Sequence, residues 1–277
     1  MLKAGMPLKP CLINYPTMKT KPDTIAQMSQ YLGLKNLALH HTELIQRAHE
    51  KQLGLLDFLE MVLGEEALRK RECSIRYRIG ESHLPRPYKL LSDFDFGFQP
   101  KLRKSLVMDL ATMEFIKHQE SLLLIGDCGT GKSHIAQALG MIGCEQGYKV
   151  LYTTCAALIG DLNSGVFEKN LLKRLRKYVN PDLLIIDEMG HDRLELQVTK
   201  EAHLLFKVVD ERYQLNRPLI FTTNVEEKAW AEYLGDPVST RAILDRIFHH
   251  AVKIEIRGPS YRQHQGMELQ KKYEKHK

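Results

Sequence analysis

The sequence predicts an α/β protein, in which a P-loop domain with a parallel sheet sandwiched by helices follows a small helical N-terminal domain. Three observations support this prediction. Short apolar runs alternate with helical patterns after about residue 90, a glycine-rich loop joins one run to a helix, and the residues before about 80 are helical. The 277 residues are enough for one large and one small domain.

The N-terminal part is expected to be a helical domain over residues 22–84, after a flexible tail at 1–21. Two apolar stripes at helical spacing predict a small bundle whose core they would fill. The first stripe contains Leu37, Leu44, Ile45 and Ala48, and the second contains Leu55, Phe58, Leu59, Val62 and Leu63. The two prolines of "HLPRPY" stop any helix and mark a linker to the larger domain.

The larger domain is expected over residues 85–262, followed by a loose charged tail at 263–277. Its strand candidates are 121–125, 149–154, 182–187, 218–223 and 251–256. Helical stretches lie between consecutive candidates, which predicts a parallel sheet with right-handed crossovers.

A phosphate-binding loop is predicted by "LLLIGDCGTGKSH" at residues 122–134. Residues 126–133 fit G-x-x-x-x-G-K-[ST] and lie between an apolar strand and a helix, as this motif requires. Its glycines leave backbone amides open to an anion at the helix N-terminus. Lys132 would reach the β- and γ-phosphates of ATP, and the Ser133 hydroxyl would ligate Mg²⁺. The predicted nucleotide-binding residues are Gly126, Asp127, Cys128, Gly129, Thr130, Gly131, Lys132, Ser133 and His134.

The ends of two later strands supply candidate catalytic side chains. Asp187 and Glu188 end the apolar strand "LLIIDE", at the edge of the sheet where α/β sites lie. Asp187 would hold Mg²⁺, and Glu188 would polarise a water molecule for attack on the γ-phosphate. Asn224 ends "PLIFTTN" and could orient that water, although an Asn here is equally a common turn residue.

Charge and cysteine content restrict the class of protein. The net charge of +6, from 40 basic and 34 acidic residues, is compatible with a polyanionic partner. Five scattered cysteines without a CxxC pair argue against a disulfide framework or a zinc module and favour a reducing compartment. Because no stretch resembles a signal peptide or a membrane span, we expect a cytoplasmic protein without membrane contacts. Met18 could begin the protein, so residues 1–17 are left out of the fold.

Two basic clusters are candidate DNA-binding sites. The first contains Lys173, Arg174, Arg176 and Lys177, and the second contains Arg69, Arg71, Arg76 and Arg78. Such clusters attract phosphate backbones regardless of base sequence. Either run alone is equally well explained as a solvated helix face. No base-reading element is evident, so we expect binding that is largely independent of sequence.

The phosphate loop, the strand-end Asp-Glu and the strand-end Asn have the order and spacing seen in AAA+ ATPases. More closely, the chain resembles IstB-like transposition helper proteins, relatives of the DnaC helicase loaders, over roughly residues 24–262. The matching stretches include "GDCGTGKSHIAQALG", "LLIIDEMG", "FKVVDERYQLNRPLIFTTN" and "TRAILDRIFHHAVKIEIRGPSYR". One departure is "GDCG", where the family commonly has two prolines; the backbone chemistry should survive that change.

The resemblance implies a bacterial protein that assembles with ATP on DNA as a homo-oligomer and hands target DNA to a cognate transposase. It also implies that no C-terminal lid domain is present, in keeping with the short segment 259–277 after the last strand. Three alternatives stay open: a DnaC-like helicase loader, a P-loop small-molecule kinase, and a DNA-binding switch that hardly hydrolyses ATP.

Arg241 matches the position of the family's arginine finger, a residue that one subunit projects toward the nucleotide of the next. The stretch "STRAILDRIFHH" predicts a helix capped by Ser239 or Thr240, with Arg241 in its first turn. A cation in that turn opposes the helix dipole and gains nothing locally. Arg246 is the alternative finger, and an ion pair with a nearby carboxylate would explain it equally well.

Overall fold

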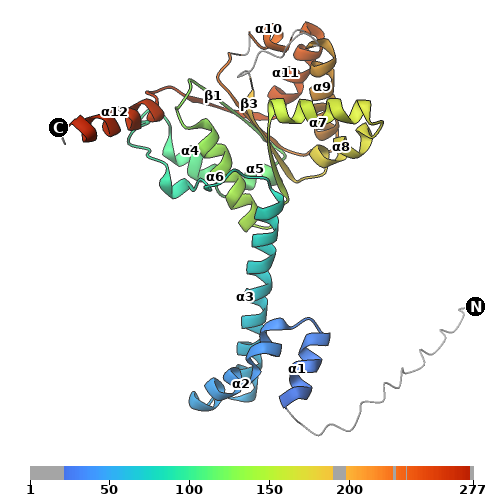
Figure 1. The fold of residues 1–277 in the computed structure, drawn as a ribbon, viewed down its shortest axis with the longest axis vertical. Helices are drawn as coiled ribbons and strands as arrows, with labels where there is room; N and C mark the ends of the chain where they lie inside the picture. Colours follow the sequence, from blue (N-terminus) through green and yellow to red (C-terminus); the bar gives the residue numbers. More distant parts are fainter. Residues whose placement is uncertain (1–21, 190–197, 227–228, 235, 275–277) are drawn as a thin grey trace, which may run out of the picture. The chain divides into compact units, whose positions relative to one another are not determined.

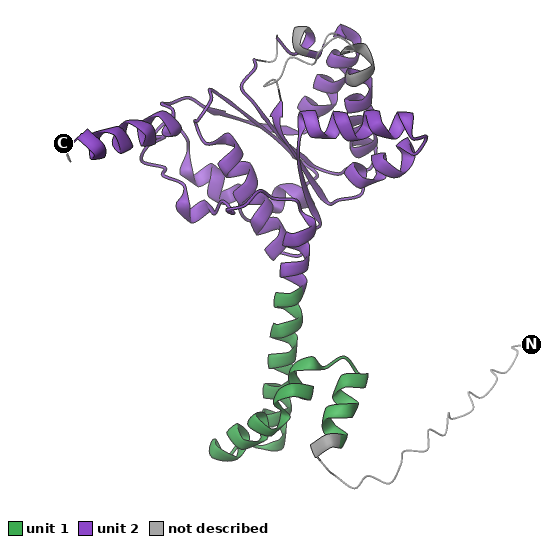
Figure 2. Cartoon of the chain, in the orientation of Figure 1, with its two compact units in different colours: residues 1–73 green, residues 74–277 purple. Residues whose placement is uncertain are grey.

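The computed structural model describes residues 22–189, 198–226, 229–234 and 236–274. The chain forms two compact units, which we call the N-terminal unit (residues 1–73) and the C-terminal unit (residues 74–277) (Figure 2). The division lies inside helix α3 (Leu55–Glu81). This helix continues from one unit into the other because its basic stretch contains no proline that would end it. The sequence placed the domain boundary later, between residues 84 and 85, next to the first prolines.

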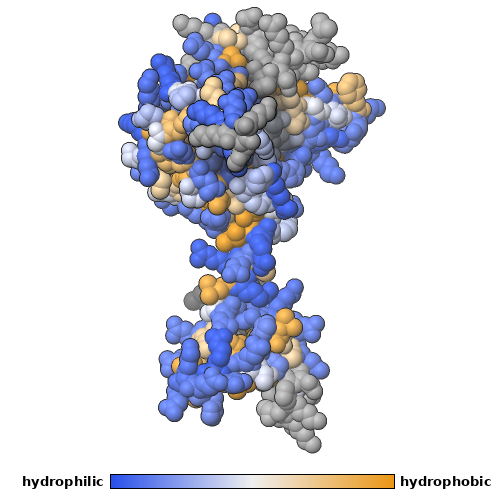
Figure 3. Space-filling view, turned by 60° about the vertical axis from the view of Figure 1, so that its left-hand side comes forward, coloured by the Kyte–Doolittle hydropathy of each residue, from blue (hydrophilic) through white to orange (hydrophobic). Residues whose placement is uncertain are grey.

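The N-terminal unit is built from α1 (Pro22–Tyr31), α2 (Lys35–Glu50) and the first part of α3. Leu44 and Val62 are buried, as the apolar stripes predict. The expectation that both stripes fill a core is wrong for Ile45, which is 48% exposed, and for Leu55, Leu59 and Leu63, which are 89%, 53% and 52% exposed. The described helices of this unit are too few to cover both stripes, and apolar patches interrupt its hydrophilic surface (Figure 3).

A buried carboxylate ties α3 to the beginning of α2. Glu66, which is 3% exposed, accepts hydrogen bonds from the amides of Asn36 (2.7 Å) and Leu37 (3.3 Å). These amides belong to the first turn of α2, whose N–H groups have no partner within the helix. Arg69 pairs with the same carboxylate at 2.8 Å. Burial raises the pKa of Glu66, but the hydrogen bonds outweigh burial and hold this pKa below its usual value.

The C-terminal unit contains a five-stranded sheet with the strand order β2-β3-β4-β1-β5. The strands are β1 (Ser121–Gly126), β2 (Val150–Thr154), β3 (Leu183–Met189), β4 (Leu219–Thr223) and β5 (Ala251–Ile256). All four neighbouring pairs are parallel, which confirms the predicted α/β class. The central strands are apolar on both faces because helices cover the sheet on both sides.

Helices form one layer on each face of the sheet (Figure 1). One layer contains α4 (Lys104–Leu110), α5 (Glu114–Lys117) and α6 (Lys132–Glu145). The other contains α7 (Cys155–Phe167), α8 (Leu171–Val179), α9 (Val198–Gln214), α10 (Trp230–Leu234) and α11 (Pro237–His249). Alternate side chains of β1 enter the two cores: Leu122 and Leu124 face one layer, and Leu123 faces the other.

One further helix, α12 (Tyr261–Glu274), follows β5 in the described part of the chain, and it extends away from the sheet (Figure 1). Residues 257–274 therefore contain no lid domain, as expected. The expectation of a loose tail from residue 263 is wrong over this helix. Its sequence is rich in strong helix formers, although none of its side chains is buried.

Arg212 closes the sheet at the edge opposite the phosphate loop. Its guanidinium is fully buried and donates hydrogen bonds to five backbone carbonyl oxygens, at distances from 2.6 to 3.3 Å. The acceptors belong to Tyr178 and Val179 at the end of α8, to Pro181 and Asp182 before β3, and to Pro218 before β4. Burial lowers the pKa of Arg212 to about 9, and the positive charge of Arg217 acts in the same direction, whereas the charge of Asp182 opposes it.

Candidate active site

The phosphate loop connects β1 to α6 and requires backbone without side chains. Gly129 and Gly131 have φ angles of +79° and +102°, in the left-handed region that favours glycine. A Cβ atom on Gly131 would lie 2.5 Å from Cε2 of Phe94, and one on Gly129 would lie 2.1 Å from Oγ of Ser260. The bare loop therefore results both from its own conformation and from the two segments packed against it.

Lys132 points back into this loop. Its Nζ donates hydrogen bonds to the carbonyl oxygens of Gly126 (2.7 Å) and Asp127 (2.8 Å). Burial lowers the pKa of Lys132, and the negative charges of neighbours such as Asp187 offset this only in part. Burial disfavours the charged form of Lys132, and an anion beside the side chain would stabilise that form again. The ammonium group is therefore suited to bind phosphate.

Asp187 and Ser133 are joined directly, although they are 54 residues apart in the chain. The Ser133 hydroxyl donates to Oδ1 of Asp187 at 2.8 Å. Tyr152 donates to Oδ2 at 2.5 Å, and Thr222 donates to Oδ1. Asp187 is 1% exposed, and burial together with its charge raises the pKa of Tyr152. A hydroxyl and a carboxylate are the oxygen ligands that Mg²⁺ prefers, so these residues fit the cation.

Glu188 has an unusual backbone conformation that the sequence did not reveal. Its φ angle is +59°, and the pairing of β3 with β4 shifts register between Ile186 and Met189. The amide of Glu188 donates to Oγ1 of Thr222 at 3.1 Å. In a regular strand, side chains alternate between two faces. The irregularity holds Asp187 in the interior and leaves the Glu188 side chain exposed.

A cavity of about 600 Å³ collects most of the predicted site residues. Its lining includes Cys128, Gly129, Gly131, Lys132, Ser133, His134, Glu188 and Asn224. Nδ2 of Asn224 lies 3.6 Å from Sγ of Cys128, so the end of β4 faces the phosphate loop across this cavity. Thr130 lies behind the loop, where its hydroxyl donates to the carbonyl oxygen of Asp127 at 2.8 Å. The cavity combines the phosphate loop with the exposed carboxylate of Glu188, and the buried Asp187, which does not line it, is joined to it by the hydrogen bond from Ser133.

The cavity also contains residues that the sequence did not single out, among them Tyr261 and Arg262 at the beginning of α12. The amide of Tyr261 donates to the carbonyl oxygen of Gly129 at 2.9 Å, which fixes the start of α12 to the phosphate loop. The stretch "GPSYR" after the last strand could have signalled a return of the chain, because proline and glycine mark turns.

Arg241 and Arg246 have different surroundings on α11. Arg241 is exposed, whereas Arg246 pairs with Asp210 at 2.5 Å and lies over the ring of Phe206. The predicted helix cap is wrong. Asp236 caps α11 by accepting a hydrogen bond from the Val238 amide at 3.0 Å, and Pro237 occupies the first helical position. Arg241 therefore lies beyond the first turn, where a helix dipole acts weakly.

The two basic clusters are only partly available to a ligand. Arg174 pairs with Asp161 and Glu168, and Lys177 lies 3.4 Å from Asp161. Arg69 is held by Glu66, and Arg78 donates to the carbonyl oxygen of Cys144 at 2.8 Å. By contrast, Lys173, Arg176 and Arg71 are exposed. The sequence could not separate these two groups, because the acidic partners are distant in the chain or on other turns.

The sheet order, the phosphate loop after β1 and the acidic pair near the end of β3 define a P-loop ATP-binding protein of the AAA+ fold. Within this class, the chain belongs to the family of IstB-like ATP binding proteins, whose family model matches residues 26–268.

Relatives from insertion sequences agree with this membership. A protein of Geobacillus stearothermophilus, assigned as the ATP-binding protein of insertion sequence IS5376, is 35% identical over 87% of this chain and 94% of its own length. The protein assigned to the same role in IS21 of Pseudomonas aeruginosa is 34% identical over 83% of this chain and 85% of its own.

A solved structure supports the fold. AMPPCP-bound DnaA from Aquifex aeolicus superimposes with a TM-score of 0.51 at 20% identity, over 63% of this chain and 51% of the DnaA chain. This likeness concerns the fold alone. In the described ranges, no helix is both long and apolar enough to span a bilayer.

Proposed function

We propose that this protein is an Mg²⁺-dependent ATPase that assembles on DNA with ATP and hands target DNA to the transposase of an insertion sequence. The observation that carries the proposal is the hydrogen bond between Ser133 and Asp187, which unites the phosphate loop with the acidic end of β3. The insertion-sequence relatives support the biological setting.

The residues of the cavity support ATP hydrolysis by direct attack of water. Lys132 and the loop amides would bind the β- and γ-phosphates. Ser133 and Asp187 would hold Mg²⁺, which when bound supplies positive charge to the phosphate oxygens. Glu188 would take a proton from the water as its oxygen bonds to the γ-phosphorus. The bond to the bridging oxygen of ADP then breaks, so ADP and phosphate result.

Asn224 would orient the attacking water, since it faces the phosphate loop from the end of β4. Arg241 would supply a further positive charge to the γ-phosphate held by a neighbouring subunit. Its exposure on α11, without a place in its own nucleotide cavity, supports action on a second copy of the chain. Arg246 is the weaker candidate because Asp210 and Phe206 already hold it.

DNA contacts are proposed for the exposed members of the basic clusters, with Lys173 and Arg176 foremost. Phosphate contacts from lysine and arginine carry affinity without base specificity. Arg174 is withdrawn from the proposed contacts, because it holds two carboxylates.

The proposal can be tested by measuring ATP binding and hydrolysis in variants, alone and mixed. Lys132→Ala should lose ATP binding, whereas Glu188→Gln should bind ATP and fail to hydrolyse it. Arg241→Ala should bind ATP and hydrolyse it slowly. Mixing Arg241→Ala with Lys132→Ala should restore part of the activity, since an intact Arg241 then faces an intact phosphate loop.

Arg246→Ala is the matched control. A mixture of Arg246→Ala with Lys132→Ala should show no more ATPase activity than a mixture of the wild-type protein with Lys132→Ala. An equal loss of ATP binding in Lys132→Ala and Glu188→Gln would refute the assigned roles. Absence of recovery in mixtures, with mixed assembly confirmed, would refute the action of Arg241 on a second copy.

A further inference from the structure

Tyr152 is a half-buried tyrosine of β2 whose hydroxyl binds the carboxylate of Asp187 on the neighbouring strand β3. Its hydroxyl donates to Oδ2 of Asp187 at 2.5 Å. Tyr152 is not among the residues that line the cavity at the phosphate loop, which we call the nucleotide cavity. Any effect of Tyr152 on a bound nucleotide must therefore pass through Asp187.

The two oxygens of the Asp187 carboxylate are held by different donors. Oδ1 accepts from the Ser133 hydroxyl at 2.8 Å, from the Glu188 amide at 3.1 Å and from the Thr222 hydroxyl. Oδ2 accepts from Tyr152. The last side-chain torsion of aspartate has broad minima, so a carboxylate that is held at one oxygen can still turn about it. Donors on both oxygens fix the plane of the group.

The hydroxyl of Tyr152 is itself held in one orientation. An ionised carboxylate only accepts hydrogen bonds, so the hydroxyl proton must point toward Asp187. The side chain of Gln137 is a second hydrogen-bond partner, and it opposes the rise in the pKa of Tyr152 that burial and the charge of Asp187 cause. A group that lowers the pKa of a phenol in this way donates to its oxygen. Tyr152 therefore links α6, which carries Gln137 and Ser133, to Asp187 on β3.

We propose that Tyr152 is a positioning residue for Mg²⁺, because it sets the plane of the carboxylate that Asp187 presents to the cation. The proposal rests on the Mg²⁺ site of the proposed function and adds a residue to it. Mg²⁺ demands a nearly ideal octahedral arrangement of oxygen ligands, so its binding depends strongly on how a carboxylate is oriented. Hydrogen-bond partners that orient the ligands of a metal typically contribute roughly 10- to 100-fold to its affinity.

A purely structural role is the competing explanation, since a buried carboxylate oxygen requires a hydrogen-bond partner in any case. The two roles differ in what Tyr152→Phe changes. A structural role predicts lower stability with unaltered binding of Mg²⁺ by the folded protein. A positioning role predicts weaker binding of Mg²⁺, whereas ATP binding without the metal, which would depend on the phosphate loop and Lys132, stays the same.

The test measures the affinity of the full chain for a fluorescent, non-hydrolysable ATP analogue, once with saturating Mg²⁺ and once with EDTA. With Mg²⁺, Tyr152→Phe should bind the analogue roughly 10- to 100-fold more weakly than the wild-type protein. With EDTA, the two proteins should have the same affinity. The variant keeps the ring that packs against the core, and circular dichroism and thermal unfolding without nucleotide verify that it is folded.

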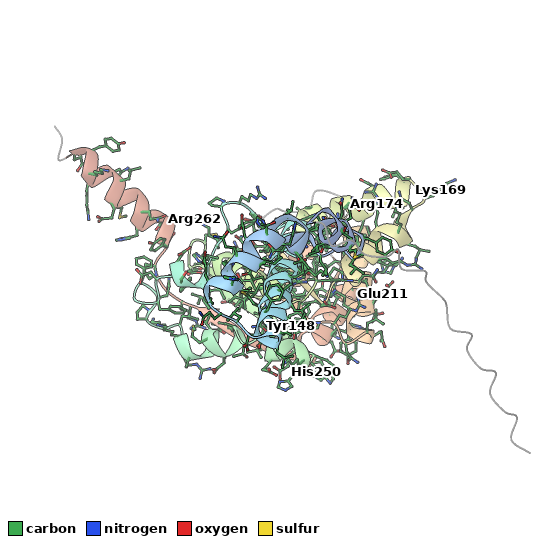
Figure 4. All side chains as sticks on the ribbon, turned by 90° about the horizontal axis from the view of Figure 1, so that it is seen from below. Tyr148, Lys169, Arg174, Glu211, His250 and Arg262 are labelled. Carbon is green, nitrogen blue, oxygen red and sulfur yellow. The ribbon has the colours of Figure 1, made fainter. Side chains whose placement is uncertain are left out.

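Tyr178→Phe is the matched control, because the Tyr178 hydroxyl also donates to an aspartate, Oδ2 of Asp161, at 2.7 Å. Asp161 is not among the residues that line the nucleotide cavity. Arg174, which pairs with the same carboxylate, lies on the opposite side of the C-terminal unit from Arg262 at that cavity (Figure 4). Tyr178→Phe should therefore leave the affinity for the analogue unchanged, both with Mg²⁺ and with EDTA.

An affinity of Tyr152→Phe that equals that of the wild-type protein with Mg²⁺ would overturn the positioning role. An equal loss with Mg²⁺ and with EDTA would overturn it too, since Tyr152 would then support the cavity as a whole. In both cases the Mg²⁺ site would stand, provided that Asp187→Asn abolished the effect of Mg²⁺ on binding. If the wild-type protein bound the analogue equally well with Mg²⁺ and with EDTA, the Mg²⁺ site of the proposed function would fail, and the role of Tyr152 with it.

Discussion

Lys132 and Arg212 are cations that bind backbone carbonyl oxygens at opposite edges of the same sheet. Arg212 is buried, and Lys132 is half-buried. Arg212 has five carbonyl acceptors and is fully buried. Lys132 has two acceptors and borders a cavity. Burial lowers the pKa of both groups. The two cations differ in whether another acceptor could replace the carbonyl oxygens. No ligand can reach the buried guanidinium of Arg212, whereas phosphate oxygens can reach the ammonium group of Lys132 through the cavity.

The same chemistry therefore serves stability in one place and ligand binding in the other. A cation that satisfies many carbonyl groups away from solvent fixes the turns that supply them. A cation with few acceptors beside a cavity can exchange those acceptors for the oxygens of a ligand when a ligand enters the site. Substitutions at the two positions should consequently separate folding from nucleotide binding.

The largest effect is expected for Arg212→Met, which keeps the length of the side chain and removes its charge and donors. Several buried carbonyl oxygens would lose their partners, so the free energy of unfolding should fall by roughly 3–5 kcal/mol. Urea denaturation without nucleotide measures this change. Arg174→Met is the matched control, since Arg174 pairs with carboxylates at the surface, and it should cost far less. A similar cost for both variants would break the comparison.

Lys132→Met should have an intermediate effect that depends on ATP. Without nucleotide, loss of two hydrogen bonds from a half-buried side chain should cost only about 1 kcal/mol. ATP at a hundred times its Kd stabilises a binding protein by about 2.7 kcal/mol, and the variant should lose this gain. Thermal unfolding with and without ATP and Mg²⁺ measures both quantities. A normal ATP-induced shift in Lys132→Met would contradict the assignment of the phosphate loop.

The smallest effect is expected in the difference between two variants that each add a single methyl group to a glycine. Gly131→Ala and Gly147→Ala both place alanine at a φ near +100°, which should cost about 1–2 kcal/mol in each case. Only the Cβ at residue 131 would meet another group, the ring of Phe94 at 2.5 Å. Gly131→Ala should therefore lose more stability than Gly147→Ala, and it alone should weaken ATP binding. If the two variants had the same stability and the same affinity for ATP, the ring of Phe94 would have moved aside for the new methyl group without an energetic cost.

Much of the nucleotide site could be predicted from the sequence because its parts are local. The phosphate loop is a continuous motif, and Asp187 and Asn224 each end an apolar run that is recognisable as a strand. The parallel order of the strands then brings these ends to the same edge. The fold class followed from the same alternation of strands and helices.

Contacts between distant segments could not be predicted in this way. Nothing local shows that Thr222 binds the Glu188 amide, or that Tyr152 and Thr222 donate to Asp187. The role of Arg212 depends on carbonyl groups that lie about 30 residues away in the chain. The cap at Asp236 was a missed local signal, because Asp followed by Pro is a favoured helix start.

The backbone at Glu188 has a consequence for how this chain could change in evolution. Its position is set by a left-handed φ angle and by the hydrogen bond that its backbone amide donates to Oγ1 of Thr222, and neither uses its own carboxylate. Codons for glutamate and glutamine differ by a single base. Under the proposed role of Glu188, one such mutation would stop ATP hydrolysis while leaving the sheet edge in place, so a lineage could exchange the proposed ATP-driven cycle for a long-lived ATP-bound assembly without redesigning the fold.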